Sequence, residues 1–241
     1  MMAPAPPPDL VVAESVDALV DDVAAQIRRV AAAAVAAHGR FRVALAGGST
    51  PRALYPRLIQ GVDWTRADVF FGDERAVPPD DPQSNYRMAR ETLLAPAQVP
   101  AENVFRWQTE AADLDAAARA YEEALRRRAP RPLLDLALLG LGPDGHTASL
   151  FPGTAALTVE DRLAVAVDVP ALKTRRLTLT YPVFLEAGAV FFLVTGPDKR
   201  AALADAVRPG STLPAARIIH GSRVVRIFSD RAAAQDINPA T

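Results

Sequence analysis

Short, continuously apolar segments that alternate with helical patterns are the feature of this sequence that most restricts its fold. The predicted strands are residues 41–46, 67–71, 134–139, 163–169, 176–179, 189–194 and 224–228. The predicted helices, from apolar spacings of three and four and from local start signals, are residues 14–37, 49–59, 85–94, 114–128, 182–187, 197–207 and the tail from residue 230. Strands that are apolar on both sides and alternate with helices are typical of a mostly parallel sheet covered by helices on both faces. We therefore predict an α/β fold.

The division of the chain into domains follows from the same pattern. No internal repeat and no low-complexity linker occurs after residue 10. Half of the residues are hydrophobic, which is enough for a sizeable core. We expect a short disordered Pro-rich tail over residues 1–10 and a single domain over residues 11–241.

Composition excludes several kinds of chemistry. The chain has no cysteine, which rules out disulfides, thiolate catalysis and iron–sulfur clusters, and its three histidines lie far apart in the sequence. The net charge of −1 means that the chain has no excess of positive charge with which to bind nucleic acid or an anionic membrane. The N-terminus lacks the features of a signal peptide, and the most apolar stretch, residues 30–37, is too short to span a membrane. We expect a cytoplasmic protein that works with oxygen and nitrogen groups.

Four polar, glycine-bearing loops follow predicted strands, directly after Ala46, Phe71, Leu139 and Val194. Ligands of open α/β sheets bind at the carboxyl ends of the strands. The four loops are therefore expected to meet at one site.

Two of these loops have glycine patterns that suggest anion binding. In residues 47–51 (Gly-Gly-Ser-Thr-Pro) the two glycines let the backbone approach a ligand closely, and a helix begins there with Ser49 or Thr50 as its cap. The free N–H groups of a helix start suit a phosphate. A plain capped turn is the alternative. Residues 140–145 match Gly-x-Gly-x-x-Gly, but Pro152 and Gly153 would break the crossover helix that a dinucleotide fingerprint needs, so we reject NAD binding.

The remaining candidates are charged or titratable groups at strand ends. His146 lies in a polar turn, where an imidazole can take a proton from water near neutral pH, although a lone histidine is more often structural. Asp73 would hold a sugar hydroxyl or orient an acid–base group, and Arg75 would pair with an anion. The alternative for residues 72–75 is a solvated charged turn. Lys199 lies in the first turn of a predicted helix, where the helix dipole favours acidic residues, so a lysine there suggests an anionic ligand. An ordinary surface lysine is the commoner case.

Several of these segments together resemble one family, the 6-phosphogluconolactonases. The most specific stretch is residues 140–153, Gly-Leu-Gly-Pro-Asp-Gly-His-Thr-Ala-Ser-Leu-Phe-Pro-Gly. Residues 45–51, residues 71–75 with the later Ser-Asn-Tyr at 84–86, and residues 196–199 also match, in family order. The resemblance extends from about residue 14 to residue 237.

The resemblance implies a Rossmann-like fold shared with sugar-phosphate isomerases and glucosamine-6-phosphate deaminase. It also implies hydrolysis of 6-phospho-D-glucono-1,5-lactone to 6-phosphogluconate, the second step of the oxidative pentose phosphate pathway, with no metal or organic cofactor. His146 and Asp73 are the implied catalytic residues. The implied substrate- and phosphate-binding residues are Gly47, Gly48, Ser49, Thr50, Arg75, Arg176 and Lys199. Because Arg175 lies directly beside Arg176, the resemblance leaves open which of the two matches the family's arginine.

The resemblance also separates the lactonase from its relatives. Deaminases are expected to carry a glutamate that supports their ring-opening histidine, and here the aligned position is Phe151. This disfavours a sugar-phosphate isomerase or deaminase. A non-catalytic effector domain that senses sugar phosphates is a third alternative. It is disfavoured because the segment before the first helix is too short for a DNA-binding element and because His146 is present. We expect a small sugar-phosphate lactone as the ligand, no nucleic acid or membrane partner, and a monomer or small homo-oligomer.

Hydrolysis of a lactone, an activated ester, requires no covalent nucleophile. We expect His146 to abstract a proton from a water molecule that attacks the C1 carbonyl. Backbone N–H groups of the glycine loops or Arg75 would stabilise the resulting oxyanion.

Overall fold

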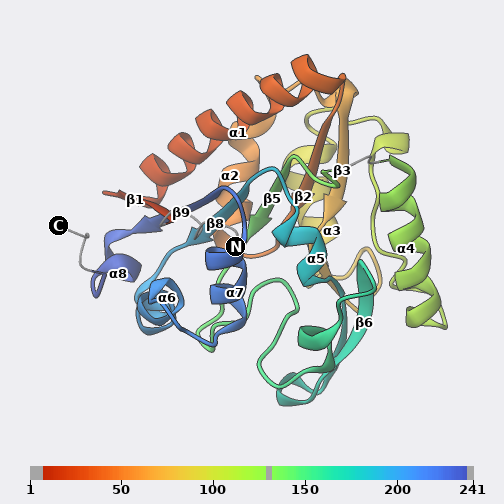
Figure 1. The fold of residues 1–241 in the computed structure, drawn as a ribbon. Coiled ribbons are helices and arrows are strands. Elements are labelled where there is room, and N and C mark those ends of the chain that lie inside the picture. Colours follow the sequence, from red (N-terminus) through yellow and green to blue (C-terminus); the bar gives the residue numbers. More distant parts are fainter. Residues whose placement is uncertain (1–7, 129–131, 238–241) are drawn as a thin grey trace.

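A six-stranded parallel sheet forms the centre of the computed structural model, which describes residues 8–128 and 132–237 (Figure 1). In spatial order its strands are β1 (Asp9–Ala13), β9 (Val225–Asp230), β8 (Val190–Val194), β5 (Leu136–Leu139), β2 (Phe41–Leu45) and β3 (Ala67–Phe71). Every neighbouring pair is parallel. The prediction of a mostly parallel α/β sheet is confirmed.

The helices lie on both faces of this sheet, as predicted. Figure 1 shows α1 (Val16–His38) and α2 (Ser49–Leu54) on one side, with α5 (Tyr181–Leu185), α6 (Arg200–Val207) and α7 (Pro214–Gly221) on the other. All residues of β2, β3, β5 and β8 are buried between these layers. This accounts for the continuous apolar runs, because both sides of each strand face helices.

A second sheet of three antiparallel strands was not predicted. Its order is β4 (Asp73–Arg75), β7 (Thr174–Leu179) and β6 (Ala164–Val169). The alternative of a solvated turn at residues 72–75 is wrong, because Asp73–Arg75 is a short strand whose first two residues are buried. It is held in place where Gly72 donates to Leu45 O and accepts from Leu179 N, both at 2.9 Å.

Other predicted boundaries need smaller corrections. The expected tail over residues 1–10 extends too far: residues 1–7 lie outside the described residues, and Asp9 and Leu10 belong to β1, which pairs in register with β9. The helix expected over 85–94 is α3 (Asn85–Ala89) followed by a π-helical turn, Arg90–Leu94. The chain also contains α4 (Leu114–Arg128) and α8 (Arg231–Ala234) near their predicted positions.

Two further differences concern short helices. The helix α7 was not predicted, although its buried residues Ala215, Ile218 and Ile219 have helical spacing. The predicted helices 49–59 and 197–207 each consist of two parts, an α-helix and a 3₁₀ turn at Tyr55–Leu58 and Pro197–Lys199 respectively. Among the described residues, no helix has the length and apolar character needed to cross a membrane.

Candidate active site

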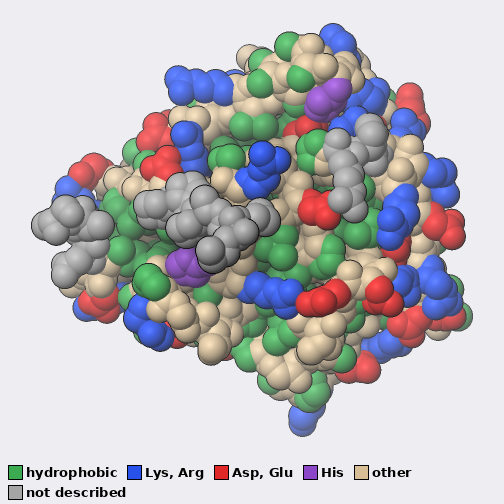
Figure 2. All heavy atoms as spheres, viewed as in Figure 1, with side chains coloured by type: hydrophobic (Ala, Val, Ile, Leu, Met, Phe, Trp, Pro, Cys, Tyr) green, Lys and Arg blue, Asp and Glu red, His purple; other side chains and the backbone are tan. Residues whose placement is uncertain are grey.

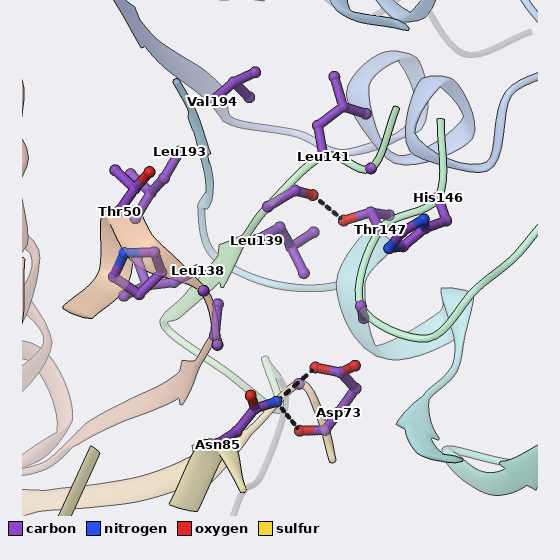
Figure 3. A pocket seen from close by; sticks show the side chains of 18 of the residues that line it. Thr50, Asp73, Asn85, Leu138, Leu139, Leu141, His146, Thr147, Leu193 and Val194 are labelled. Carbon is purple, nitrogen blue, oxygen red and sulfur yellow. Dashed lines mark hydrogen bonds between the residues drawn. The ribbon is translucent and has the colours of Figure 1, made fainter. Parts of the chain in front are cut away.

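A cavity of about 320 Å³ lies where the carboxyl ends of β2, β3, β5 and β8 meet (Figure 3). The chain passes from β2 to β3 on one side and from β5 to β8 on the other, so the cavity sits at the switch point of the sheet. All four loops selected from the sequence contribute to its wall. The predicted site residues that line it are Gly47, Gly48, Ser49, Thr50, Asp73, Arg75, His146, Arg176 and Lys199.

His146 is held by neighbours on its edge and on its face. Its Nδ1 lies 2.5 Å from Oδ1 of Asp144, and its ring stacks on Phe151 with centroids 3.9 Å apart. Because an ionised carboxylate only accepts hydrogen bonds, Nδ1 carries the proton and Nε2 keeps a lone pair. This is the arrangement that a histidine general base requires.

Asp144 is therefore the group that orients His146, a role that the sequence had left open for Asp73. Partial burial alone would raise the pKa of Asp144, but the hydrogen bonds and charge of His146 outweigh it and hold the pKa below its usual range. The carboxylate therefore remains ionised beside the imidazole, where it stabilises an imidazolium once His146 has taken a proton.

Asp73 has different partners. Its Oδ2 accepts a 2.6 Å hydrogen bond from Ser149 Oγ, and its Oδ1 accepts from Asn85 Nδ2 at 3.3 Å. Its side chain lines the cavity wall formed by β4, as Figure 3 shows. The carboxylate is thus fixed in position without contacting the imidazole of His146.

Glu74, between the two candidate residues on β4, is buried rather than solvated. Its two oxygens accept from the backbone N–H groups of Arg75, Asn85 and Tyr86 and from Ser84 Oγ. Burial raises the pKa of Glu74, and the backbone donors partly oppose that effect. This carboxylate fastens the start of α3 to β4.

The structure separates Arg175 from Arg75 and Arg176, which both line the cavity. Arg175 pairs with Asp168 at 3.2 Å and with Asp115 at 3.4 Å, away from the cavity. Arg176 lines the cavity, and its buried Nε has no hydrogen-bond partner within the described part of the chain. Burial lowers the pKa of Arg176, with the nearby Asp73 opposing. An incompletely paired, partly buried guanidinium of this kind is suited to an anionic ligand.

The glycine loop after β2 differs in detail from the expectation. Gly48 precedes the first residue of α2, and neither Ser49 nor Thr50 caps the helix. The Thr50 hydroxyl instead lies 2.7 Å from the hydroxyl of Thr195, which follows β8. Lys199 enters the same cavity and pairs with Asp198 at 2.9 Å. Two loops distant in sequence therefore share one wall.

Sequence reasoning did not single out Asn85, Ser149 or Thr195 as site residues. Asn85 and Ser149 lie in segments that carry the family resemblance but were given no role, and Thr195 lies outside those segments. Only the folded chain brings them to the cavity or to Asp73. Among residues 8–128 and 132–237, no group of three His, Asp or Glu side chains is placed to hold a metal ion.

Comparisons with known proteins place this chain in a family. A family model described as glucosamine-6-phosphate isomerases/6-phosphogluconolactonase matches residues 14–227. The 6-phosphogluconolactonase of a Nostoc species is 44% identical over 184 residues, covering 74% of this chain and 76% of the relative. That of Mycobacterium tuberculosis is 38% identical over 217 residues, covering 84% and 88% respectively.

A solved structure agrees with these sequence matches. The 6-phosphogluconolactonase of Trypanosoma brucei superimposes with a TM-score of 0.86 at 28% identity, covering 96% of this chain and 99% of that one. Since the family model spans most of the chain and relatives above 30% identity cover much of it, the chain belongs to the family of glucosamine-6-phosphate isomerases and 6-phosphogluconolactonases.

Proposed function

We propose that this protein hydrolyses 6-phospho-D-glucono-1,5-lactone to 6-phosphogluconate, the second step of the oxidative pentose phosphate pathway, in the cytoplasm. The relatives named 6-phosphogluconolactonase support the substrate. The observation that carries the proposal is the His146–Asp144 pair in a cavity that also contains Arg75, Arg176 and Lys199. A base beside several cations suits an ester that carries a phosphate group.

The proposed reaction begins with a water molecule between His146 and C1 of the lactone. Nε2 of His146 removes a proton from this water while its oxygen attacks C1, and the C1 carbonyl oxygen becomes negatively charged. The tetrahedral intermediate then collapses, the bond from C1 to the ring oxygen breaks, and the imidazolium returns its proton to that oxygen. No covalent enzyme intermediate is needed.

The oxyanion requires hydrogen-bond donors that are already in place. Arg75 is one candidate, and the partly buried Arg176 is the other charged donor in the same wall. Donors fixed before reaction stabilise developing charge without further reorganisation. Asp73, which is already held by Ser149, would accept a hydrogen bond from a sugar hydroxyl.

The phosphate group would bind at the opposite part of the cavity. Gly48, Ser49 and Thr50 lie there at the start of α2, and Lys199 supplies the positive charge. Lys199 would exchange its contact with Asp198 for the phosphate. Capture of this distant end would position C1 beside His146.

Amine chemistry is disfavoured by the same local geometry. The side chain stacked on His146 is Phe151, where the deaminases are expected to place a supporting glutamate. An aromatic ring cannot accept a proton from the imidazole, so the supporting glutamate expected in deaminases has no counterpart at this position.

The test is a lactone-hydrolysis assay on freshly made substrate, with the spontaneous rate subtracted. His146→Ala should lower kcat by about 10²–10⁴-fold, the usual contribution of a general base. Binding of 6-phosphogluconate, measured by calorimetry, should change little because the phosphate contacts remain. An unchanged kcat would remove His146 from the reaction, and ammonia release from glucosamine 6-phosphate by the wild type would favour the deaminase instead.

A further inference from the structure

Asn85 lies at the base of the cavity and is 3% exposed. It is the first residue of α3, and its backbone N–H donates to Glu74 at 2.8 Å. Figure 3 shows its side chain directed at Asp73. None of the roles assigned above uses this amide.

The Asn85 amide bonds to two charged residues at once. Its Oδ1 accepts a 2.7 Å hydrogen bond from Arg75 Nη1, and its Nδ2 donates to the backbone oxygen of Asp73 at 3.1 Å and to the Asp73 carboxylate at 3.3 Å. A guanidinium can only donate and a carbonyl oxygen can only accept. These partners therefore determine which end of the amide faces which residue.

Asp73 and Arg75 would otherwise attract each other. They are two positions apart on β4, so their side chains leave the strand on the same side. Within the described chain no ion pair joins them, and the Arg75 guanidinium donates instead to the Gln83 carbonyl and to Asn85. The amide occupies the place where the two charges would meet.

The glycine loop holds the amide from a third side. A Cβ atom at Gly47 would lie only 1.8 Å from Oδ1 of Asn85. The amide therefore packs directly against the backbone of the loop proposed to bind phosphate. Its position is determined by β4, by the start of α3 and by this loop together.

We propose that Asn85 is a positioning residue that keeps the Asp73 carboxylate and the Arg75 guanidinium separate, so that each can bind substrate on its own. The inference rests on the proposed lactone hydrolysis, in which Asp73 binds a hydroxyl and Arg75 is one of the two candidate charged donors to the oxyanion. If the two charges paired with each other, both would be less available to the substrate.

The first test is Asn85→Ala in the lactone assay. Loss of the spacer should lower kcat by roughly 10- to 100-fold, the effect expected when reacting groups shift by about 1 Å. KM should change less, because Lys199 and the loop at 48–50 keep their places. A crystal structure of this variant should show an ion pair between Asp73 and Arg75.

The second test is Asn85→Asp, which preserves the shape of the side chain. An ionised carboxylate facing Asp73 would repel it, whereas a protonated one can still donate as the amide does. The charged groups around this position, Asp73, Glu74, Arg75 and Arg176, are unchanged in the variant. The ratio of variant to wild-type kcat should therefore rise as the pH is lowered.

Asn103 provides a matched control elsewhere in the fold. It is also buried, its Oδ1 accepts from Arg40 at 3.0 Å, and its Nδ2 donates to the Thr65 carbonyl at 3.1 Å. It does not line the cavity. Asn103→Ala and Asn103→Asp should lower the thermal midpoint but leave kcat and its pH dependence close to wild type.

The possible outcomes separate the inference from the proposed function. A wild-type protein without lactonase activity would refute the function, and the crystal structure of Asn85→Ala would then decide the inference alone. An active wild type with unchanged kcat in Asn85→Ala, a flat pH ratio in Asn85→Asp, or separated Asp73 and Arg75 side chains in the crystal would each overturn the positioning role.

Discussion

At Gly47 and Gly142 the missing side chain leaves room for a functional group of another residue. A Cβ at Gly142 would lie 2.0 Å from Nδ1 of His146 and 2.7 Å from Oδ1 of Asp144. A Cβ at Gly47 would meet the Asn85 amide. Neither glycine has a backbone angle that excludes alanine, so close approach alone requires these glycines.

We predict that Gly142→Ala damages the reaction more than substrate binding. The added methyl would displace His146 from Asp144, so kcat should fall by about 10- to 100-fold. The affinity for 6-phosphogluconate should stay within a few fold of wild type. Steady-state kinetics and calorimetry would measure the two effects.

Gly140→Ala is the matched control in the same loop. A Cβ there would have no atom within 4 Å, so the His146–Asp144 contact should be preserved. Equal losses of kcat in the two variants would contradict the steric explanation for Gly142.

At the scale of elements, the antiparallel sheet decides which arginine reaches the site. The pairing of β4 with β7 places Arg75 opposite Arg176, and side chains alternate along a strand. Arg175 therefore points the other way, toward Asp168 and Asp115. A shift of this register by one residue would exchange the two arginines.

Tyr181 is one of the residues that join α5 to α7. Tyr181 begins α5, and its hydroxyl donates to the Pro214 carbonyl at the start of α7, at 3.2 Å. The guanidinium of Arg217 lies 4.3 Å from the centre of its ring. Burial raises the pKa of Tyr181 to about 12, with Arg217 opposing.

We predict an alkaline stability effect for Tyr181→Phe. At neutral pH the variant should be less stable by about 1 kcal/mol, the usual net value of one hydrogen bond. Above pH 10 the unfolded chain ionises at this tyrosine while the folded chain resists until about pH 12, so wild type loses stability that the variant keeps. The difference in unfolding free energy should therefore shrink between pH 10 and 12.

Urea denaturation of both proteins at pH 8, 10 and 11 would measure that difference. A constant difference over this range would mean that the Tyr181 hydroxyl ionises equally in the folded and unfolded chains.

At the scale of the whole molecule, one hydrophobic core connects both sheets. It includes Phe71 of β3 and Phe192 of β8, together with Leu177 of β7 and Val167 of β6 from the smaller sheet. On the face drawn in Figure 2, Lys and Arg side chains are interspersed with Asp and Glu, in keeping with the near-zero net charge. The positive charge that matters for the proposed substrate is gathered inside the cavity.

We propose from this shared core that the chain from Asp9, where β1 begins, forms a single domain. Thermal unfolding should then be one cooperative transition, because neither sheet can lose its packing alone. Tryptophan fluorescence, which reports on Trp64 and Trp107 near β3, should give the same midpoint as far-UV circular dichroism and as loss of activity. Two separate midpoints would indicate two independently folding units.

The sequence by itself determined the alternation of strands and helices, the four loops and most residues of the candidate site. Apolar periodicity, glycine loops and short motifs are local, so they can be read without the fold. The strand β4 was not predicted because it spans only 3 residues, too few to produce a period.

Only the tertiary structure decided how these residues are arranged. It made Asp144 rather than Asp73 the partner of His146, chose Arg176 over Arg175, and placed Asn85 between two charges. The Asp144–His146 contact depends on how one loop folds, and Asn85 reaches β4 across the loop that separates them. The pairing that selects the arginine joins β4 to β7, which are far apart in the chain. Strand register and packing between such segments are set by the burial of whole faces, and no local stretch of sequence contains both partners.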